Sequence, residues 1–343
     1  KDADLAAQIL KEKIKEKKRI RIIGDYDIDG IQSTYILYCA LRRLGADADF
    51  VIPDRILDGY GLNEHLVTRA SQDGIDTILT CDNGISAIDQ IHLAKSLGMT
   101  VVVTDHHEVP FTEVDGVRRE KVCEADAVVN PKQQACHYPF KKLCGAAVAF
   151  KLVQVLYEVF GLEVSEADCF IENAGFATVG DVMDLQGENR ILVKYGLKQL
   201  ADTTNPGYRA LLAVNGLEGK KLTAYHIGFV IGPCINASGR LDTAKRALEL
   251  LGASSKTEAE KLAGDLKALN DSRKDLTAKG TTEAIRLIEE TDLGQDKVLV
   301  VYLPDCHESL AGIIAGRIRE RYFRPCFVLT DGEEGVKGSG RSI

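Results

Sequence analysis

The sequence predicts an α/β protein in which a doubly wound, mostly parallel sheet is joined by a long helix to a second, smaller α/β domain. Short apolar segments alternate with helical segments through the first 130 residues, and glycines stand where those helices should end. A new alternation begins after a long charged segment near the C-terminus. Strands that alternate with helices are joined by right-handed crossovers and therefore run parallel in one sheet.

The first sheet is expected to contain five strands. Their hydrophobic spacing places them at Arg19–Ile23, Ala48–Ile52, Asp76–Thr80, Thr100–Thr104 and Ala125–Val129. The helices between the strands are expected at Ile31–Leu44, Asn63–Gln72 and Ile85–Leu97. Gly45, Gly74 and Gly98 follow these helices, and glycine ends a helix readily because it adopts left-handed backbone angles without strain.

A helical region follows the sheet. Its segments are Ala146–Phe160, Ser165–Ala177, Glu188–Leu200 and Gly207–Val214. Thr257–Glu290 is charged and has helical spacing, which suits either a surface helix pair or a connector between domains. The last unit is expected to have strands at Lys297–Leu303 and Pro325–Leu329, a helix at Leu310–Tyr322 and a glycine-rich end at Val336–Ile343.

We therefore expect three regions in the chain. They are a sheet domain at 1–235, a connecting helical region at 236–293 and the start of a second domain at 294–343. The last region is short for an independent hydrophobic core, so we expect the chain to stop inside that domain.

Composition excludes several classes of protein. Of the 343 residues, 45% are hydrophobic and 27% are charged, and no apolar run approaches the roughly 18 residues of a membrane span. The nine cysteines form no Cys-x-x-Cys pair, which argues against zinc ribbons and disulfides and favours reduced thiols in the cytoplasm. A net charge of −8 argues against a general electrostatic hold on nucleic acid, so a polyanion would need a local basic groove.

Polar side chains gather directly after the predicted strands, where open parallel sheets form their sites. Carboxylates or imidazoles follow the first, third and fourth strands, and one further acid lies in the apolar helical region: Asp25, Asp27, Asp29, Asp82, Asp105, His106, His107 and Asp181. Oxygen-rich ligands with one or two imidazoles suit manganese or magnesium better than zinc. Several carboxylates can bridge two such ions roughly 3.5–4 Å apart, which is an arrangement used in phosphoryl chemistry.

Each motif has another interpretation when it is taken alone. Asp25–Gly30 matches the opening of an EF-hand calcium loop, but its twelfth position, where a bidentate glutamate belongs, is Ile36. Asp82–Gly84 is also typical of a simple turn, and adjacent histidines can be structural. The convergence of four segments on one sheet edge favours a metal site.

These motifs, in this order, resemble the DHH phosphoesterase superfamily, and within it the RecJ-type single-strand-specific exonucleases. The residues that carry the resemblance are Asp25–Gly30, Asp82–Gly84, Asp105–His107 and Ala177–Asp181. The likeness continues through Ile52–Arg55 with Gly59–Leu62, Gly232–Arg240, His307 with Glu308, and Lys337–Ser342, and it covers nearly the whole chain. By this resemblance, the last region is the start of a DHH-associated domain.

The resemblance implies roles for named residues. Metal ligation is implied for Asp25, Asp27, Asp82, His106 and Asp181, which would hold two divalent cations, Mn or Mg. Asp82 would bridge the ions, His107 would contact the scissile phosphate, Asp29 would support the loop and Asp105 would orient an imidazole. A pocket for a terminal 5′ phosphate is implied at Arg55, Ser339, Gly340 and Arg341, and Arg240 and His307 would line the path of the strand.

Two positions depart from the family pattern. Cys234 stands where family members often carry arginine, which removes one phosphate contact. Ile23 stands where some members carry histidine, so the first ion would rest on Asp25 instead.

The resemblance implies a metal-dependent 5′ to 3′ exonuclease that hydrolyses single-stranded DNA to 5′ mononucleotides in DNA repair and recombination. Single-stranded DNA is the expected partner, together with a single-strand-binding protein and a helicase, and the chain is expected to be a cytoplasmic monomer without a membrane segment. A nanoRNA or cyclic-dinucleotide phosphodiesterase, or a pyrophosphatase, of the same superfamily is one alternative. A non-catalytic DHH-like nucleic-acid-binding factor is another.

Overall fold

The computed structural model describes residues 1–55, 58–332 and 335–343, which form two compact units. The first unit comprises Lys1–Gly239 and Thr243–Gly264, and the second comprises Arg240–Asp242 and Asp265–Ile343. Each unit has its own sheet and its own hydrophobic core. The division at 235 and 293 that the sequence suggests stays a prediction.

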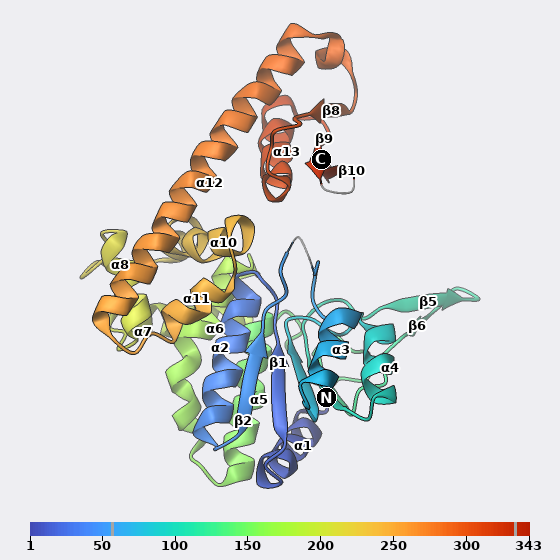
Figure 1. Cartoon of the computed structure of the whole chain (residues 1–343), viewed down its shortest axis with the longest axis vertical. Helices are drawn as coiled ribbons and strands as arrows, with labels where there is room; N and C mark the ends of the chain where they lie inside the picture. Colours follow the sequence, from blue (N-terminus) through green and yellow to red (C-terminus); the bar gives the residue numbers. More distant parts are fainter. Residues whose placement is uncertain (56–57, 333–334) are drawn as a thin grey trace. The chain divides into compact units, whose positions relative to one another are not determined.

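The first unit is built on a five-stranded sheet with the order β2-β1-β3-β4-β7 (Figure 1). The strands are β1 (Arg19–Ile23), β2 (Asp47–Val51), β3 (Thr77–Cys81), β4 (Thr100–Thr104) and β7 (Ala127–Val129). All four pairings are parallel, which confirms the predicted doubly wound sheet. β1 lies between β2 and β3, so the chain continues from β1 to one side of the sheet and then crosses to the other side. The position between β1 and β3 is therefore the switch point of the sheet, and parallel sheets have an open crevice at such a point.

Helices cover both faces of this sheet. Ile22 and Leu79 pack on one face with α1 (Ala3–Lys15), α2 (Ile28–Arg43) and α5 (Gly145–Phe160). On the other face, Ile23 and Ile78 pack against α3 (Glu64–Gln72) and α4 (Ile88–Ser96). Successive side chains of a strand point to opposite faces, so strands covered on both sides read as the continuous apolar runs seen in the sequence.

A helical layer follows α5. Its elements are η1 (Val164–Phe170), α6 (Ile171–Gly180), α7 (Gly187–Ala201), α8 (Pro206–Val214), α9 (Ala224–His226), η2 (Ile227–Ile231), α10 (Gly232–Leu241) and α11 (Lys245–Leu251). The prediction of a single helix at Ser165–Ala177 is wrong, because a 3-10 segment occupies its first part. Ala167 and Phe170 are both buried in the core, and positions three apart share one face in a 3-10 helix.

A two-stranded hairpin, β5 (Phe111–Val114) and β6 (Val117–Glu120), was absent from the prediction and extends from the first unit (Figure 1). Its turn is Asp115-Gly116, and both residues have positive φ, at 54° and 74°. Type I′ hairpin turns of two residues need this conformation at both positions, and Asp-Gly is a sequence signal for them. The signal was therefore present in the sequence.

The second unit has a three-stranded sheet with the order β10-β9-β8. Its elements are β8 (Leu299–Tyr302), α13 (Glu308–Tyr322), β9 (Cys326–Gly332) and β10 (Gly335–Arg341), preceded by the turn η3 (Asp292–Gln295). The glycine-rich end thus forms an edge strand, antiparallel to β9. Ala284 and Ile288 of α12 (Lys256–Glu290) complete the core, so the charged segment is one helix that begins in the first unit and ends in the second.

No helix within residues 1–55, 58–332 and 335–343 combines the length and the apolar character needed to cross a bilayer.

Candidate metal centre

The loop after β1 places three carboxylates at the start of α2. Asp27 is the N-cap of α2, and its Oδ1 accepts hydrogen bonds from the backbone N–H of Asp29 at 2.9 Å and of Gly30 at 3.1 Å. The fully buried Asp29 caps a second helix instead. Its two carboxylate oxygens accept from the N–H of Gly145 at 2.6 Å and of Ala146 at 2.7 Å, at the start of α5. These are helix-end donors that lack a partner within the helix, so one short motif anchors two helices.

Asp82 follows β3 and is 2% exposed. Its φ is 61°, a left-handed conformation that is uncommon outside glycine and that concentrates at functional sites. The first residue of α5 must be very small here, because a Cβ on Gly145 would stand 2.7 Å from the Asp82 Cβ. Next to it, the Asn83 amide donates to the carbonyls of Ile23 at 3.1 Å and Cys81 at 2.9 Å, which fixes the ends of β1 and β3 together.

Asp105 positions the two histidines that follow β4. Its Oδ1 accepts from the backbone N–H of His106 at 2.7 Å and of His107 at 3.1 Å, and it lies 2.8 Å from the His107 Nδ1. Its Oδ2 accepts from the Ile85 N–H at 2.9 Å. With both oxygens engaged, Asp105 orients an imidazole, in the way that outer carboxylates hold metal-binding histidines.

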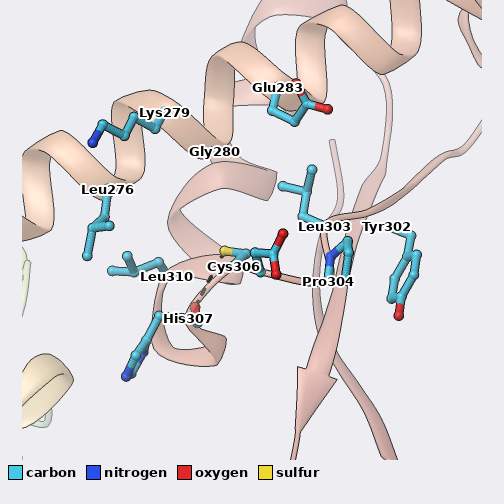
Figure 2. Close-up of a pocket in the computed structure, with 11 residues that line it drawn as sticks. Leu276, Lys279, Gly280, Glu283, Tyr302, Leu303, Pro304, Cys306, His307 and Leu310 are labelled. Carbon is cyan, nitrogen blue, oxygen red and sulfur yellow. Dashed lines mark hydrogen bonds between the residues drawn. The ribbon is translucent and has the colours of Figure 1, made fainter.

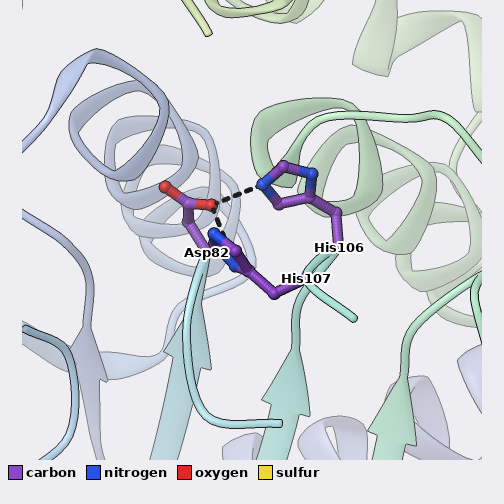
Figure 3. A group of neighbouring side chains, drawn as sticks. All are labelled: Asp82, His106 and His107. Atoms are coloured by element: carbon purple, nitrogen blue, oxygen red, sulfur yellow. Dashed lines mark ion pairs between the residues drawn. The ribbon is translucent and has the colours of Figure 1, made fainter. Parts of the chain in front are cut away.

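The four segments meet around His106. Its Nε2 lies 3.1 Å from the Asp82 Oδ1, 3.5 Å from the Asp29 Oδ2 and 3.7 Å from the Asp181 Oδ2. Figure 3 shows both imidazoles turned toward the Asp82 carboxylate, with the His107 Nδ1 4.0 Å from its Oδ1. Asp181 comes from the C-cap of α6.

Three overlapping groups of side chains could each hold a metal ion. They are Asp25, Asp27 and Asp82; Asp82, His106 and His107; and Asp29, His106 and Asp181. In each group, one ligand atom from every residue lies within 4.8 Å of the others. Asp82 belongs to two groups, which is the position that a bridging carboxylate requires.

Burial and mutual repulsion raise the pKa values of the clustered carboxyls, and the nearby Arg55, His107 and Lys132 offset the shifts only in part. Burial, and then the charge of Asp27, raises the pKa of Asp25 to about 7. Burial, and then Asp29 and Asp27, raises the pKa of Asp181 to about 8. The pKa values of Asp27 and Asp82 are raised by the same two effects, burial first and neighbouring carboxylates second. Ionised carboxylates in such a cluster need a cation beside them.

The two histidines are shifted in opposite directions. Burial lowers the pKa of His106, which keeps this imidazole neutral and able to act as a metal ligand. Burial also works against the charged form of His107, but the hydrogen bond and the charge of Asp105 outweigh it and raise the pKa of His107.

The donor set fits divalent cations that prefer oxygen ligands. Within the described residues, the buried Oδ1 atoms of Asp25 and Asp82 and the buried Nδ1 of His106 have no hydrogen-bond partner. Burying an unsatisfied carboxylate oxygen is costly, and a hard cation would satisfy it. Carboxylates with one imidazole suit manganese or magnesium.

The residues expected to bind substrate lie in both units. In the first unit, the Arg55 guanidinium lies 4.8 Å from the ring centroid of Tyr26. Tyr26 stands between Asp25 and Asp27 in the loop after β1. Nearby, the Tyr60 hydroxyl donates to the carbonyl of Asp82 at 3.0 Å and lies 3.2 Å from the ring nitrogens of His107. The remaining residues, Arg240, His307, Ser339, Gly340 and Arg341, belong to the second unit.

In the second unit, three of these residues, Ser339, Arg341 and Arg240, lie against α13. The Arg341 Nη1 donates to the Ser339 Oγ at 3.0 Å, and a Cβ on Gly312 of α13 would stand 2.8 Å from the same Ser339 Oγ. The Arg240 Nη1 donates to the Ser309 carbonyl at 2.9 Å, and the Ser309 Oγ donates to the Arg240 carbonyl at 3.0 Å.

His307 is the N-cap of α13 and lines a cavity of about 400 Å³ between α12 and the loop after β8. Figure 2 shows Leu276 and Lys279 of α12 and Leu303 of the loop in its walls. The cavity lies within the second unit, and His307 is the sequence-predicted site residue that lines it.

The supporting role of α5 was not predicted from the sequence. Gly145 approaches Asp82, and its N–H with that of Ala146 holds Asp29. The sequence predicted the start of α5 to within one residue. It did not show which carboxylate would cap the N-terminus of this helix. Cys144, the N-cap residue, makes no side-chain capping bond, and the cap comes from 116 residues earlier in the chain.

Comparison with known proteins gives matches along the whole chain. Residues 19–173 match the family model described as DHH family, N-terminal domain. The chain is 38% identical over 340 residues to the single-stranded-DNA-specific exonuclease RecJ of Bacillus subtilis, covering 98% of this chain and 41% of that protein. It therefore spans about two fifths of the length of this curated relative.

Solved structures match as well. The crystal structure of exonuclease RecJ bound to manganese matches with a TM-score of 0.86 and 34% identity, over 100% of this chain and 82% of that one. The structure of RecJ from Thermus thermophilus in complex with Mg²⁺ matches with a TM-score of 0.75 and 32% identity, over 100% of this chain and 45% of that one.

Proposed function

The chain belongs to the DHH family, and from that premise we propose that it is a metal-dependent exonuclease that degrades single-stranded DNA from its 5′ end to 5′ mononucleotides. Its relatives act on single-stranded DNA, and two related structures hold manganese or magnesium. The proposal includes two divalent cations, Mn or Mg, and a role in DNA repair and recombination.

The convergence of carboxylates at the sheet edge carries this proposal. Asp25, Asp27 and Asp82 lie beside the switch point between β1 and β3, and Asp181 and His106 close the cluster. These five residues would hold the ions, with Asp82 shared between them. Bound divalent cations supply activation of the attacking water and stabilise the charge that develops on the phosphate.

The remaining residues orient the substrate and hold protons. Asp105 fixes the ring of His107 and favours its charged form, so the imidazolium can donate a hydrogen bond to a phosphate oxygen next to the metal centre. The Tyr60 hydroxyl supports the same ring. Asp29 keeps the loop of Asp25 and Asp27 in place through its bonds to α5.

The proposal assigns the terminal 5′ phosphate to arginines. Arg55, Ser339, Gly340 and Arg341 are the residues proposed for this role, because guanidinium and backbone N–H groups suit phosphate geometry. Arg240 and His307 would contact the strand. A few focused arginines are sufficient despite the net charge of −8, since affinity depends on the phosphates actually contacted.

Partners and location extend this proposal. The chain would act as a monomer on strands delivered by a helicase and covered by a single-strand-binding protein. The nine cysteines are free thiols, and a cytoplasmic location would suit them.

Digestion of end-labelled DNA tests the function. A 5′-phosphorylated single-stranded 30-mer and the matching duplex are incubated with manganese, and products are resolved by length and end chemistry. We expect 5′ mononucleotides from the single strand only, no product in EDTA, and no product from Asp82→Ala. The control Asp89→Ala changes an exposed acid in the first turn of α4 and should digest DNA like the unchanged protein.

A dinucleotide substrate separates the alternatives. Cleavage confined to the dinucleotide would favour a nanoRNA or cyclic-dinucleotide phosphodiesterase and contradict the proposal. Strand binding without cleavage of any substrate would instead favour a non-catalytic binding factor.

A further inference from the structure

Two exposed aromatic rings stand apart from the metal centre and its substrate residues. Tyr225 is 64% exposed and Phe229 is 70% exposed, although large aromatic side chains are usually buried. Their rings stack on one another with centroids 5.1 Å apart and an interplanar angle of 26°. Resting on the proposed function, we propose that Tyr225 and Phe229 form a platform on which bases of the single-stranded substrate stack beyond the metal centre.

The backbone under the platform is unusual. Tyr225 lies in α9, and Phe229 lies in η2, a π-helical turn at Ile227–Ile231 that continues directly into α10. Turns of this kind are rare and are frequently found at functional sites. The start of the segment is fixed by a capping box, in which the backbone N–H of Thr223 donates to the His226 Nδ1 at 3.0 Å. The two rings are therefore displayed from a firmly held helix.

The same helix rests on the metal centre. A Cβ on Gly232 would stand 3.2 Å from the Ile28 side chain, and the Ile28 N–H donates to the Asn236 Oδ1 at 2.9 Å. Ile28 directly follows Asp27. Phe229 is three residues before Gly232, which is about 5 Å along a helix axis. The platform thus stands roughly one helical turn from the point where the helix touches the first metal-site loop.

A second contact ties the platform to the other side of the centre. The position of a Cβ on Gly228 lies 3.8 Å from the Val179 side chain of α6, two residues before Asp181. Gly232 is buried and Gly228 is half-buried, whereas Tyr225 and Phe229 of the same segment are exposed.

The chemistry of the patch favours nucleobases over a protein partner. Tyr225 and Phe229 are the large aromatic side chains that the structure exposes between residues 196 and 275, and their rings stack on one another. Bases stack on flat aromatic faces whatever their sequence, which is how proteins hold single strands without reading them. The exposed Lys220 and Lys221 lie in the turn before α9, beside one acid, Glu218, and can accompany the phosphates.

Binding and cleavage with aromatic variants test the platform. We compare Phe229→Ala, Tyr225→Ala and the conservative Phe229→Trp with Tyr195→Ala, which removes an exposed ring on α7 that is 53% exposed. Affinity for a 5′-phosphorylated 20-mer of dT is measured in EDTA, where the strand stays intact. Loss of one stacking ring should weaken binding about 5- to 150-fold, since stacking is worth roughly 1–3 kcal/mol per base. Phe229→Trp and Tyr195→Ala should bind as the unchanged protein does.

Cleavage of a dinucleotide in manganese checks folding and separates the two proposals. The alanine variants should cleave it at the unchanged rate, because it is too short to reach the platform. Unchanged 20-mer affinity in both alanine variants would overturn the platform, whereas failure of the unchanged protein to cleave any strand would overturn the proposed function.

A fluorescent base analogue reports stacking without mutation. The fluorescence of 2-aminopurine falls when the base stacks, so scanning it along the 20-mer should reveal one or two quenched positions beyond the 5′ end. These should recover in Phe229→Ala and not in Tyr195→Ala. Absence of such quenching in the unchanged protein would also overturn the platform. This result needs no variant, so it holds even if the alanine variants fail to fold.

Discussion

The first unit gathers buried carboxylates at its sheet edge, where their ion-pair partners within the described residues are two histidines. The second unit keeps its acids at the surface and pairs them with basic side chains, as Arg286 does with Glu283 at 2.6 Å and Lys337 does with Glu308 at 2.9 Å. Exposed pairs contribute little to stability, whereas buried unpaired charges are costly. The buried acids of the first unit therefore need a bound cation to stay ionised together, whereas the surface acids of the second unit shown here have basic partners.

Replacing Asp82 of the first unit should have the largest effect on activity. Asp82→Asn should reduce exonuclease activity about 1,000-fold or more, because loss of a single charge-stabilising group at such a site already costs roughly 100- to 1,000-fold. The same change removes a buried charge, so the metal-free protein should unfold at a higher temperature at pH 8. Asp89→Asn, which changes an exposed acid, should alter neither kinetics nor calorimetry. Unchanged activity in Asp82→Asn would contradict the shared-ligand role.

The next largest effect concerns a buried acid outside the cluster. Glu172 of α6 is 7% exposed, and burial raises its pKa to about 7, although a hydrogen bond from Thr203 opposes the shift. The folded state then binds more protons than the unfolded state between the ordinary pKa and 7, so stability falls as pH rises through this range. Glu172→Gln should remove the share of this fall that Glu172 contributes, which amounts to roughly 3 kcal/mol, while the raised pKa values of Asp25 and Asp181 keep the rest. Urea unfolding at pH 5 and pH 8 measures the free energy of unfolding of both proteins. An equal loss of stability between the two pH values in both proteins would contradict this prediction.

Manganese should stabilise the first unit and leave the stability of the second unit unchanged. At about 100 times its dissociation constant, a bound ion stabilises the folded state by about 2.7 kcal/mol. Hydrogen exchange should therefore slow in the loops after β1, β3 and β4, and stay unchanged in β8 and β9. Magnesium offers a second cation for the same comparison. Equal protection of both units would show that the sheet-edge carboxylates are not where the ion binds.

The smallest effect is expected at the surface network of the second unit. Arg286→Ala removes the partner of Glu283 and Glu290 on α12. Because these groups are exposed and screened by solvent, the unfolding temperature and the exonuclease rate should both stay within measurement error. A clear loss of stability would mean that the second unit also depends on its charges.

Much of the fold was predictable because it depends on local periodicity. Apolar runs such as Arg19–Ile23 and Thr100–Thr104 match β1 and β4 residue for residue. The predicted ends of some strands were wrong where the sequence does not mark them. The strand predicted at Ala125–Val129 is one case, because only Ala127–Val129 pairs in the sheet. The hairpin at Asp115-Gly116 was missed although its turn signal is local.

The candidate site was predictable in its members but not in its arrangement. Asp25, Asp82 and His106 each follow a strand, and parallel strands bring such positions to one edge. The sequence could not show that Asp29 caps α5 or that Gly145 leaves room for Asp82, since these contacts join residues 116 and 63 positions apart. Nor could it show that Tyr225 and Phe229 are exposed, because their apolar character favours burial.

The sequence by itself determined which elements form and which side chains end the strands, because hydrophobic period and chain order act over a few residues. Only the tertiary structure decided that four separate segments share one imidazole, that Asp105 holds His107, and that the carboxyls are deprived of water. Those properties depend on burial and on distances across the fold, and both arise only when the sheet and its helices have packed.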